Sequence, residues 1–391
     1  MFSNTQAYVD LGFDVEFVTL DASDYDVPDE LRSVTFTRVP AAPSSRTIAS
    51  RAAYALGRPV RNATDHLYDR AARIRNEARA RHALDPTAIH HFEYLRAAAA
   101  CLGFEGTSVF SMHDDEHRFL VGHRTIRSDV TGRPVAAHER REQRRVAAAQ
   151  RAVYQRADLV VGIAANECAE LRAGGHNNVE LLPMSWPRAT RVERERAWVD
   201  AGILRLLHVG RIDSLPSFRS LQFILADVFP LLSPSVLDRL ELVVVGEVRD
   251  SERSASIRAL ASAYPQVSFL GFVEDLRSVY ATCDLQVVGS TAATGLRTRI
   301  VQSFAFGVPV LSTTVGAEGL EGLSPGDDIL LADSDHAFAD RLVELTEDPG
   351  QLAAVADRAR ATYDRSFSRE VVAERLGAML RSHALWAPSD H

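Results

Sequence analysis

Two arginines stand at the start of a predicted helix, where a positive charge is unfavourable unless something compensates it. Gly295 opens this helix, and Arg297 and Arg299 lie in its first turn. The helix dipole repels a cation at this end and attracts an anion. Guanidinium groups also pair well with phosphate oxygens. The spacing therefore predicts a phosphate site, and the alternative is an exposed loop with solvated arginines.

Two other strand ends in the same half of the chain combine glycine with a charged side chain. Gly210 and Arg211 follow one apolar run, and Gly246 and Glu247 follow the next. Glycine lets a ligand approach the backbone closely, and arginine suits diphosphate oxygens. Ligands of an open parallel sheet bind at the carboxyl ends of its strands. These residues are therefore candidates for the same phosphate site.

Histidines and acids follow two strands of the first half. His113 and Asp114 come after one strand, and His91 and Glu93 end another. Histidine can act as an acid, a base or a hydrogen-bonding partner near neutral pH. A surface or structural histidine is the alternative for His113, and for His91 and Glu93 the structural role is favoured. The acids at 114–116 could bind a metal ion, but consecutive acids more often begin a helix.

Composition excludes several kinds of chemistry. The chain contains no lysine, so all 44 residues of the Lys+Arg count are arginine and Schiff-base or phosphate-loop lysine chemistry is excluded. The three cysteines lie far apart, which argues against zinc fingers and disulfides. A net charge of −8 gives no basic field for nucleic acid. Without an apolar run of membrane-spanning length or a signal pattern, we expect a cytoplasmic protein.

One arginine-rich stretch could contact an anionic surface. Residues 43–82 hold nine arginines and three acids. Such a stretch could bind a membrane surface peripherally or a lipid-diphosphate acceptor. A solvated helix face whose arginine stems cover apolar surface is the favoured interpretation. The basic segment 138–156 is likewise interpreted as a surface helix.

The elements that must position these residues form two α/β domains. Short apolar runs alternate with amphipathic stretches, which is typical of a doubly wound parallel sheet. In the second half we expect strands at 203–209, 242–245, 267–270, 285–288, 308–312 and 328–331, with helices at 218–232, 251–263, 276–281, 298–306 and 336–346. The first half has expected strands at 14–20, 34–38, 88–91, 107–112, 159–163 and 179–182. We expect domains over 1–188 and 189–368, with a linker near 183–202 and a last helix and tail over 369–391.

The order and approximate spacing of these segments resemble the family-4-type retaining glycosyltransferases, or glycosyl transferases group 1. The resemblance rests on VVVG at 243–246 and FLGFV at 269–273, and above all on GLRTRI at 295–300, AFGVPV at 305–310 and GAEGL at 316–320. It covers nearly all of 159–380 and, more loosely, the first half. It implies the GT-B fold, in which two Rossmann-like domains face each other across a cleft. The second domain then binds a nucleotide-sugar donor, and the helix in 369–391 packs back on the first.

On the donor side, the resemblance implies that Arg211 and Arg299 hold the diphosphate, Arg299 standing where the family often has lysine. The helix N-terminus would meet the phosphates, and the backbone at 272–273 would pack on the base. Two arginines and a helix dipole can replace a metal ion in neutralising the leaving diphosphate, so we expect no metal and no cofactor besides the donor. The donor-side candidates are Gly210, Arg211, Gly246, Glu247, Phe272, Val273, Thr294, Gly295, Leu296, Arg297, Arg299 and Gln302.

On the first domain, the resemblance implies that His113 faces the sugar, as an orienting or acid/base residue. Asp114 would hold the imidazole or an acceptor hydroxyl. His91 and Glu93 would line the acceptor side if they are functional.

Several positions depart from the family's pattern. Many members carry two glutamates where this chain has Thr294 and Gln302. Gln302 can still hydrogen-bond a ribose hydroxyl, whereas Thr294 supplies no charge. The basic residue usual after Gly-Arg is missing from 214–217, and Pro-Met-Ser at 183–185 replaces Pro-Asn-Gly. The family begins with a strand and a glycine-rich loop, but this sequence begins inside the following helix. We expect either a start upstream of Met1 or the loss of that first strand.

Three functional hypotheses stay open. The leading one is a bacterial, retaining, metal-independent glycosyltransferase, of the type used in polysaccharide biosynthesis, with a glycan, lipid-linked or natural-product acceptor. The second is a non-catalytic partner of an active enzyme, in a homo-oligomer or with another protein. The third is a nucleotide-sugar epimerase of the same fold. A two-domain NAD enzyme is disfavoured because no Gly-x-Gly-x-x-Gly follows a strand.

Overall fold

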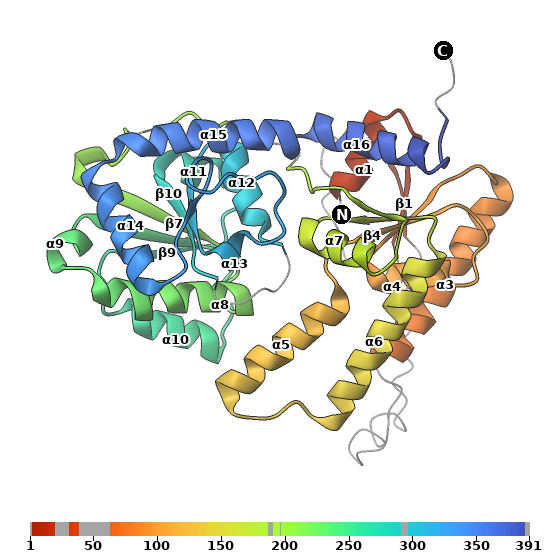
Figure 1. Ribbon diagram of the computed structural model, residues 1–391, viewed down its shortest axis with the longest axis horizontal. Coiled ribbons are helices and arrows are strands. Elements are labelled where there is room, and N and C mark those ends of the chain that lie inside the picture. Colours follow the sequence, from red (N-terminus) through yellow and green to blue (C-terminus); the bar gives the residue numbers. More distant parts are fainter. Residues whose placement is uncertain are drawn as a thin grey trace. The chain divides into compact units, whose positions relative to one another are not determined.

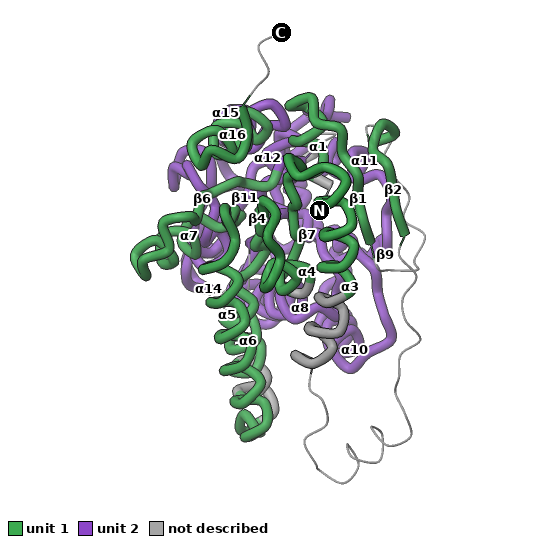
Figure 2. Tube along the Cα trace, turned by 90° about the vertical axis from the view of Figure 1, so that its right-hand side faces the viewer, with its two compact units in different colours: residues 1–184, 372–391 green, residues 185–371 purple. Residues whose placement is uncertain are grey.

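The protein consists of two α/β units, each built on parallel strands (Figure 1). The computed structural model describes residues 2–19, 31–38, 63–186, 191–195, 197–290 and 296–387. Unit 1 comprises residues 1–184 and 372–391, and unit 2 comprises residues 185–371, as coloured in Figure 2. The α/β fold class predicted from the sequence is confirmed.

Unit 2 contains a six-stranded parallel sheet in the order β12-β11-β10-β7-β8-β9. Strands with apolar side chains on both faces need helices on both sides, which explains the alternation along the sequence. The predicted strands of this half are all present. They are β7 (Leu204–Val209), β8 (Leu240–Val245), β9 (Val267–Gly271), β10 (Leu285–Val288), β11 (Val310–Ser312) and β12 (Leu330–Leu331).

Two groups of helices pack in unit 2. In one group, α12 packs on α15 and contacts α11, and in the other, α8 packs on α10. The predicted helix at 218–232 is instead α8 followed by a π-helical turn over Phe223–Val228 and a short 3₁₀ turn, in which Pro230 has no N–H to continue the helix. The helices are α8 (Leu215–Gln222), α9 (Pro234–Leu237), α10 (Glu252–Ala261), α11 (Arg277–Thr282), α12 (Thr298–Phe306), α13 (Thr314–Ala317), α14 (Asp335–Glu347) and α15 (Gly350–Ser366).

Unit 1 contains a four-stranded parallel sheet in the order β3-β4-β5-β6 and a separate parallel pair, β1-β2. All six predicted strands are present, but β3 begins and ends two residues later than predicted, because its pairing with β4 runs from His90 to Glu93. The strands are β1 (Glu16–Thr19), β2 (Thr35–Arg38), β3 (His90–Glu93), β4 (Ser108–Met112), β5 (Leu159–Gly162) and β6 (Val179–Leu181).

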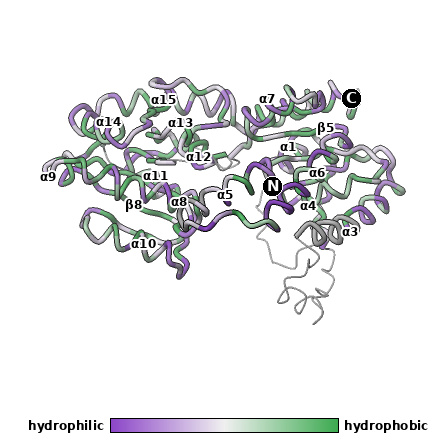
Figure 3. The backbone as a smooth tube through the Cα atoms, turned by 60° about the horizontal axis from the view of Figure 1, so that its bottom comes forward, coloured by the Kyte–Doolittle hydropathy of each residue, from purple (hydrophilic) through white to green (hydrophobic). Residues whose placement is uncertain are grey.

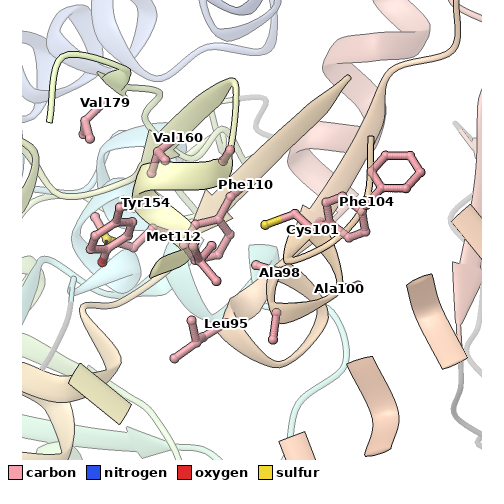
Figure 4. Packing of buried hydrophobic residues seen from close by; sticks show 14 of the residues in the cluster. Leu95, Ala98, Ala100, Cys101, Phe104, Phe110, Met112, Tyr154, Val160 and Val179 are labelled. Atoms are coloured by element: carbon pink, nitrogen blue, oxygen red, sulfur yellow. Dashed lines mark hydrogen bonds between the residues drawn. The ribbon is translucent and has the colours of Figure 1, made fainter. Parts of the chain in front are cut away.

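Buried apolar side chains hold the helices of unit 1 on these strands. Figure 4 shows Phe104, Phe110, Met112 and Tyr154 packed together in one cluster. A second cluster packs the C-terminal helix against α1 and the strands β4 and β5. The helices are α1 (Phe2–Asp10), α3 (Ala63–Leu84), α4 (Tyr94–Ala98), α5 (Glu116–Thr131), α6 (Ala137–Arg156), α7 (Ala165–Ala173) and α16 (Arg369–Ser382).

Hydropathy along the chain fits this arrangement. The strands are mostly hydrophobic, and the helices alternate between hydrophobic and hydrophilic residues (Figure 3). Among the described residues, no helix is both long and apolar enough to cross a membrane.

Part of the arginine-rich stretch lies in α3 and binds within unit 1. Arg75 Nε donates to Ala100 O at 3.0 Å, and Arg79 Nη2 donates to Gly103 O at 2.6 Å. Arg81 pairs with Glu16 at 2.6 Å and with Glu77 at 2.8 Å. These three arginines therefore have hydrogen-bond or ion-pair partners within unit 1. Residues 43–62 lie outside the described residues.

Candidate functional site

A cluster of polar side chains lies at the carboxyl ends of β3 and β4. Because β3 and β4 are parallel neighbours and Glu93 is paired with Ser111, His113 follows β4 close to Glu93. His113 Nε2 forms a short hydrogen bond with Glu93 Oε2, and His91 Nε2 lies 3.4 Å from Glu93 Oε1. Asn4 Nδ2, from α1, donates to Glu93 Oε1 at 3.0 Å and to Ser111 Oγ at 2.9 Å. The structure thus joins three of the four predicted residues of this unit.

Glu93 is the negatively charged centre of the cluster. Burial alone would raise the pKa of its carboxyl, but the hydrogen bond from His113 and the nearby His91 side chain lower that pKa well below its usual range. Glu93 therefore stays ionised at neutral pH, and it accepts hydrogen bonds without donating any.

Tyr94 holds the other side of His113 and was missed by the sequence analysis. Its ring stacks on the imidazole, with 4.2 Å between ring centroids and 18° between ring planes. Tyr94 has a φ of 63°, a left-handed conformation that is uncommon outside glycine and that often occurs at functional sites. Tyr94 is 45% exposed, so it borders solvent. No pattern in the sequence marks this conformation.

A cavity of about 1380 Å³ within unit 1 borders this cluster. Glu93, Tyr94 and His113 line it together with the consecutive residues 13–19 and 87–92. When consecutive residues of a strand line a cavity, the strand presents its edge, because alternate side chains point to opposite faces. Among the described strands, β1 pairs only with β2, and β3 only with β4. The cavity therefore opens on the edges of both sheets.

The acids after His113 begin a helix. Asp115 is the N-cap of α5 and accepts a hydrogen bond from Arg118 N at 2.8 Å, and Glu116 lies in the first turn. This is the helix start that the sequence favours over a metal site. Among the described residues, no group of three or more His, Cys, Asp and Glu could hold a metal ion. The carboxylate bound to His113 belongs to Glu93, and the role of Asp114 at the imidazole or acceptor stays a prediction.

Glu167 is a buried acid near this helix start that the sequence analysis missed. Its Oε2 accepts a hydrogen bond from Asp115 N at 3.0 Å. Burial, followed by the charges of Asp114 and Asp115, raises the pKa of Glu167 to about 7. Its position in the first turn of α7 gave no signal, because the sequence does not say which face of a helix is buried.

In unit 2, Arg299 is a cation without a carboxylate partner among the described residues. Its Nη1 donates to Val209 O at 2.8 Å and lies 3.3 Å from His208 Nε2. Burial, with the nearby charge of Arg297, lowers the pKa of Arg299 to about 9. A charge that is partly removed from water and unpaired in this way favours a bound anion.

Two glycines let the ends of β7 and β8 pack closely beside Arg299. A Cβ on Gly210, whose φ is 151°, would lie 2.3 Å from Ser217 Oγ and 3.2 Å from Arg299 Nη1. A Cβ on Gly246, whose φ is 148°, would lie 2.1 Å from Gly210 O. A side chain at Gly246 would separate the strand ends, and one at Gly210 would displace Ser217 or Arg299. The structure thus places Arg299 against the backbone that precedes Arg211.

The other arginines near this end of the sheet differ in exposure. Arg211 is nearly half exposed, and its Nε lies 2.9 Å from Asp213 Oδ1. Arg297 is 5% exposed, precedes the first turn of α12, and donates from Nε to Ser290 Oγ at 3.1 Å. The buried Arg297 therefore directly precedes α12, and Arg299 lies in the first turn of this helix. Thr294 and Gly295 lie outside the described residues, and Leu296 is partly buried.

The remaining donor-side candidates are spread between surface and core. Glu247 is exposed and binds Arg249 at 3.0 Å, and Phe272 is 76% exposed. Val273 packs against an apolar cluster. Gln302 is buried, and its Oε1 accepts a 3.4 Å hydrogen bond from the Tyr280 hydroxyl.

Tyr280 and Gln286 form a buried network under Arg299 that the sequence analysis missed. The Tyr280 hydroxyl donates to Gln286 Oε1 at 2.6 Å, and Gln286 Nε2 donates to Arg299 O at 3.0 Å. Burial raises the pKa of Tyr280, so its hydroxyl stays a donor. This network fixes the first turn of α12.

The family model that matches this chain covers residues of unit 2. Residues 204–348 match the family model described as Glycosyl transferases group 1. The GDP-mannose-dependent monoacylated alpha-(1-6)-phosphatidylinositol monomannoside mannosyltransferase of Corynebacterium glutamicum is 30% identical over 152 residues. These residues are 36% of this chain and 39% of that protein, so the match spans well under half of the relative's length.

Two solved structures share the fold over nearly the whole chain. Sucrose-phosphate synthase from Thermosynechococcus elongatus has a TM-score of 0.70 at 18% identity, covering 96% of this chain and 90% of that chain. HepE from Anabaena, in complex with UDP and glucose, has a TM-score of 0.67 at 16% identity, covering 97% and 95%. The chain therefore has the GT-B fold that the sequence resemblance implied.

Proposed function

Because residues 204–348 match the family model described as Glycosyl transferases group 1, we propose that this protein is a retaining glycosyltransferase of that family. It moves a sugar from a nucleoside diphosphate to a glycan, lipid-linked or natural-product acceptor. The observation that carries the proposal is Arg299, a partly buried cation beside the glycine turn at Gly210 and the first turn of α12. This arrangement suits the diphosphate of a nucleotide sugar.

The proposed chemistry on the donor side is stabilisation of the leaving group. Charge grows on the departing diphosphate as the bond to the sugar breaks, so a cation near it lowers the barrier. Arg299, the positive end of α12 and the exposed Arg211 would supply this positive charge. Because arginine and a helix dipole can do so without a metal ion, we infer that the reaction is metal-independent. Phe272, which is exposed, would pack on the base.

On the acceptor side, His113 would orient the sugar or move a proton at its imidazole. It lines the cavity of unit 1 and is fixed by Glu93 and Tyr94. Glu93 then holds His113 in place with His91 beside it, whereas the resemblance implied that His91 and Glu93 line the acceptor side. Lipid-linked acceptors would place the enzyme at the cytoplasmic face of a membrane.

One observation favours the second candidate, a non-catalytic partner protein. Gln302 replaces a glutamate that many members carry, and it is buried against Tyr280. If this position must present a carboxylate, the protein would bind a nucleotide without transferring sugar. Nucleotide binding is common to both candidates, and turnover separates them.

Nucleotide binding in the presence of EDTA tests the proposed donor site. GDP-mannose and UDP-glucose should be tried first, because the relatives' names mention GDP-mannose and UDP with glucose. At 100 times the dissociation constant, the ligand should stabilise the fold by about 2.7 kcal/mol in a thermal-shift assay. Stabilisation that appears only with magnesium or manganese would refute the metal-free site. Stabilisation by no nucleoside diphosphate at all would refute the donor site itself.

A further inference from the structure

We propose that Glu93 is a positioning residue that fixes the tautomer and ring orientation of His113. Its carboxylate holds the proton on His113 Nε2, which leaves Nδ1 as the ring nitrogen available to a sugar hydroxyl. The proposal rests on the function proposed above, since it gives the acceptor side of that site its geometry. Glu93 would act through His113 and would not itself touch the substrate.

The first support is the fixed position of the carboxylate. Glu93 accepts hydrogen bonds from Asn4 of α1 and from His113 in the turn after β4, and His91 Nε2 of its own strand lies 3.4 Å from Glu93 Oε1. Asn4 also binds Ser111 on β4, so it ties α1 to both strand ends. A carboxylate held from three sides cannot follow a rotating imidazole. The ring of His113 must therefore turn its N–H toward Glu93 to keep the hydrogen bond.

The second support is the direction of hydrogen bonding behind Glu93. The Tyr8 hydroxyl lies 3.0 Å from His91 Nδ1. Burial, together with the charge of Glu93, raises the pKa of Tyr8, so its hydroxyl keeps its proton and can donate to Nδ1. When Tyr8 donates to Nδ1, the neutral ring of His91 carries its proton on Nε2, facing Glu93. The Nε2–H of His91 then faces Glu93 Oε1 at 3.4 Å, and Glu93 Oε2 accepts the hydrogen bond from His113 Nε2.

The third support is Tyr94, which restrains the plane of the imidazole. The carboxylate fixes one ring nitrogen, and the stacked phenol ring fixes the plane about that nitrogen. The left-handed φ of Tyr94 turns its side chain back onto His113 immediately after β3 ends. An unfavourable conformation persists only when the surroundings impose it. Two independent contacts therefore specify one ring orientation.

A double-mutant cycle separates positioning from a structural role. The four proteins are wild type, Glu93→Gln, His113→Ala and the double variant, each measured for release of nucleoside diphosphate from whichever of GDP-mannose and UDP-glucose binds. Glu93→Gln should lower kcat by at least about 10- to 100-fold, by analogy with the residues that orient a metal-binding histidine. In the His113→Ala background the same change should cost less than about 3-fold, because its effect passes through His113. Equal losses in both backgrounds would overturn the proposal.

Controls keep the cycle interpretable. Glu180→Gln removes another glutamate of unit 1, one that pairs with Arg172 on the surface, and it should leave kcat unchanged. If Glu93→Gln does not fold, Tyr94→Gly removes the stacking ring while suiting the φ of 63°. It should lower kcat only when His113 is present. A loss that is independent of His113 would again contradict positioning.

Proton NMR supplies a readout that does not need turnover. An imidazole N–H bound to a carboxylate gives a downfield resonance, which should be present in wild type and in Glu180→Gln. The resonance of His113 Nε2–H, identified by its loss in His113→Ala, should also be absent from Glu93→Gln. A downfield resonance in a protein that releases no nucleotide would refute the proposed function and leave the positioning intact. Absence of the resonance from the folded wild type would refute the positioning.

Discussion

Replacing Arg299 by alanine is expected to weaken binding of a nucleoside diphosphate by about 10- to 150-fold. The loss corresponds to one charge-assisted hydrogen bond of about 1.5–3 kcal/mol. The effect should be large because the guanidinium lies where burial lowers its pKa to about 9, so an anion there is poorly screened by water. Isothermal titration with the nucleotide identified by thermal shift measures it.

One further variant tests whether Arg299 acts through its charge or its shape, and a second variant is a control. Arg299→Lys should recover only part of the affinity, since lysine cannot bind two oxygens in a fork. Arg341→Ala removes a surface arginine of α14 that pairs with Glu344 and should have no effect. An unchanged affinity in folded Arg299→Ala would remove the physical basis for a diphosphate at this strand end.

Replacing His113 by alanine is expected to lower kcat about 10²- to 10⁴-fold, the range typical of a positioned acid or base. Affinity for the nucleotide should stay within about 2-fold, because His113 belongs to unit 1 and the proposed diphosphate contacts belong to unit 2. Steady-state release of nucleoside diphosphate, together with titration of the nucleotide, measures both quantities. His383→Ala, which changes a histidine near Glu180 on the same unit, is the matched control. A kcat within about 2-fold of wild type would leave His113 without a catalytic role.

The strands could be predicted because their apolar runs are short and separated by helical patterns. The bounds of strand β3 could not be predicted in this way. Apolarity placed the strand at 88–91, whereas pairing with the buried β4 extends it to Glu93. This shift puts His91 and Glu93 two residues apart within the strand, on one face, with Phe92 buried on the other. The acidic partner of His113 follows from that register and not from the position of Asp114 in the sequence.

Other parts of the cluster have no signal in the sequence. Asn4 reaches Glu93 from a helix some ninety residues away, and only the packing of α1 brings the two together. The left-handed backbone of Tyr94 is uncommon for a residue other than glycine, so no local pattern predicts it.

The arginine pair was visible in the sequence because cations are unusual at a helix start. What the sequence did not reveal is the environment of each one. Arg297 is bound to Ser290, whereas Arg299 lies against Val209 O and His208. Gln302 was expected to hydrogen-bond a ribose hydroxyl. It lies in α12, where every residue from Ile300 to Phe306 is buried. A helix that is buried all round leaves few positions for ligand contacts.

Turnover of the bound donor in excess EDTA tests whether this protein transfers a sugar from a nucleoside diphosphate with retention of configuration. The donor selected by thermal shift is incubated with the protein, with water or an added glycan as acceptor. Nucleoside diphosphate is quantified, and NMR reads the configuration at the anomeric carbon of the released or transferred sugar. Wild type should release nucleoside diphosphate, Arg299→Ala should lose most of this release, and the product should keep the configuration of the donor. A donor that binds but is never turned over, or a product with inverted configuration, would contradict the proposed function.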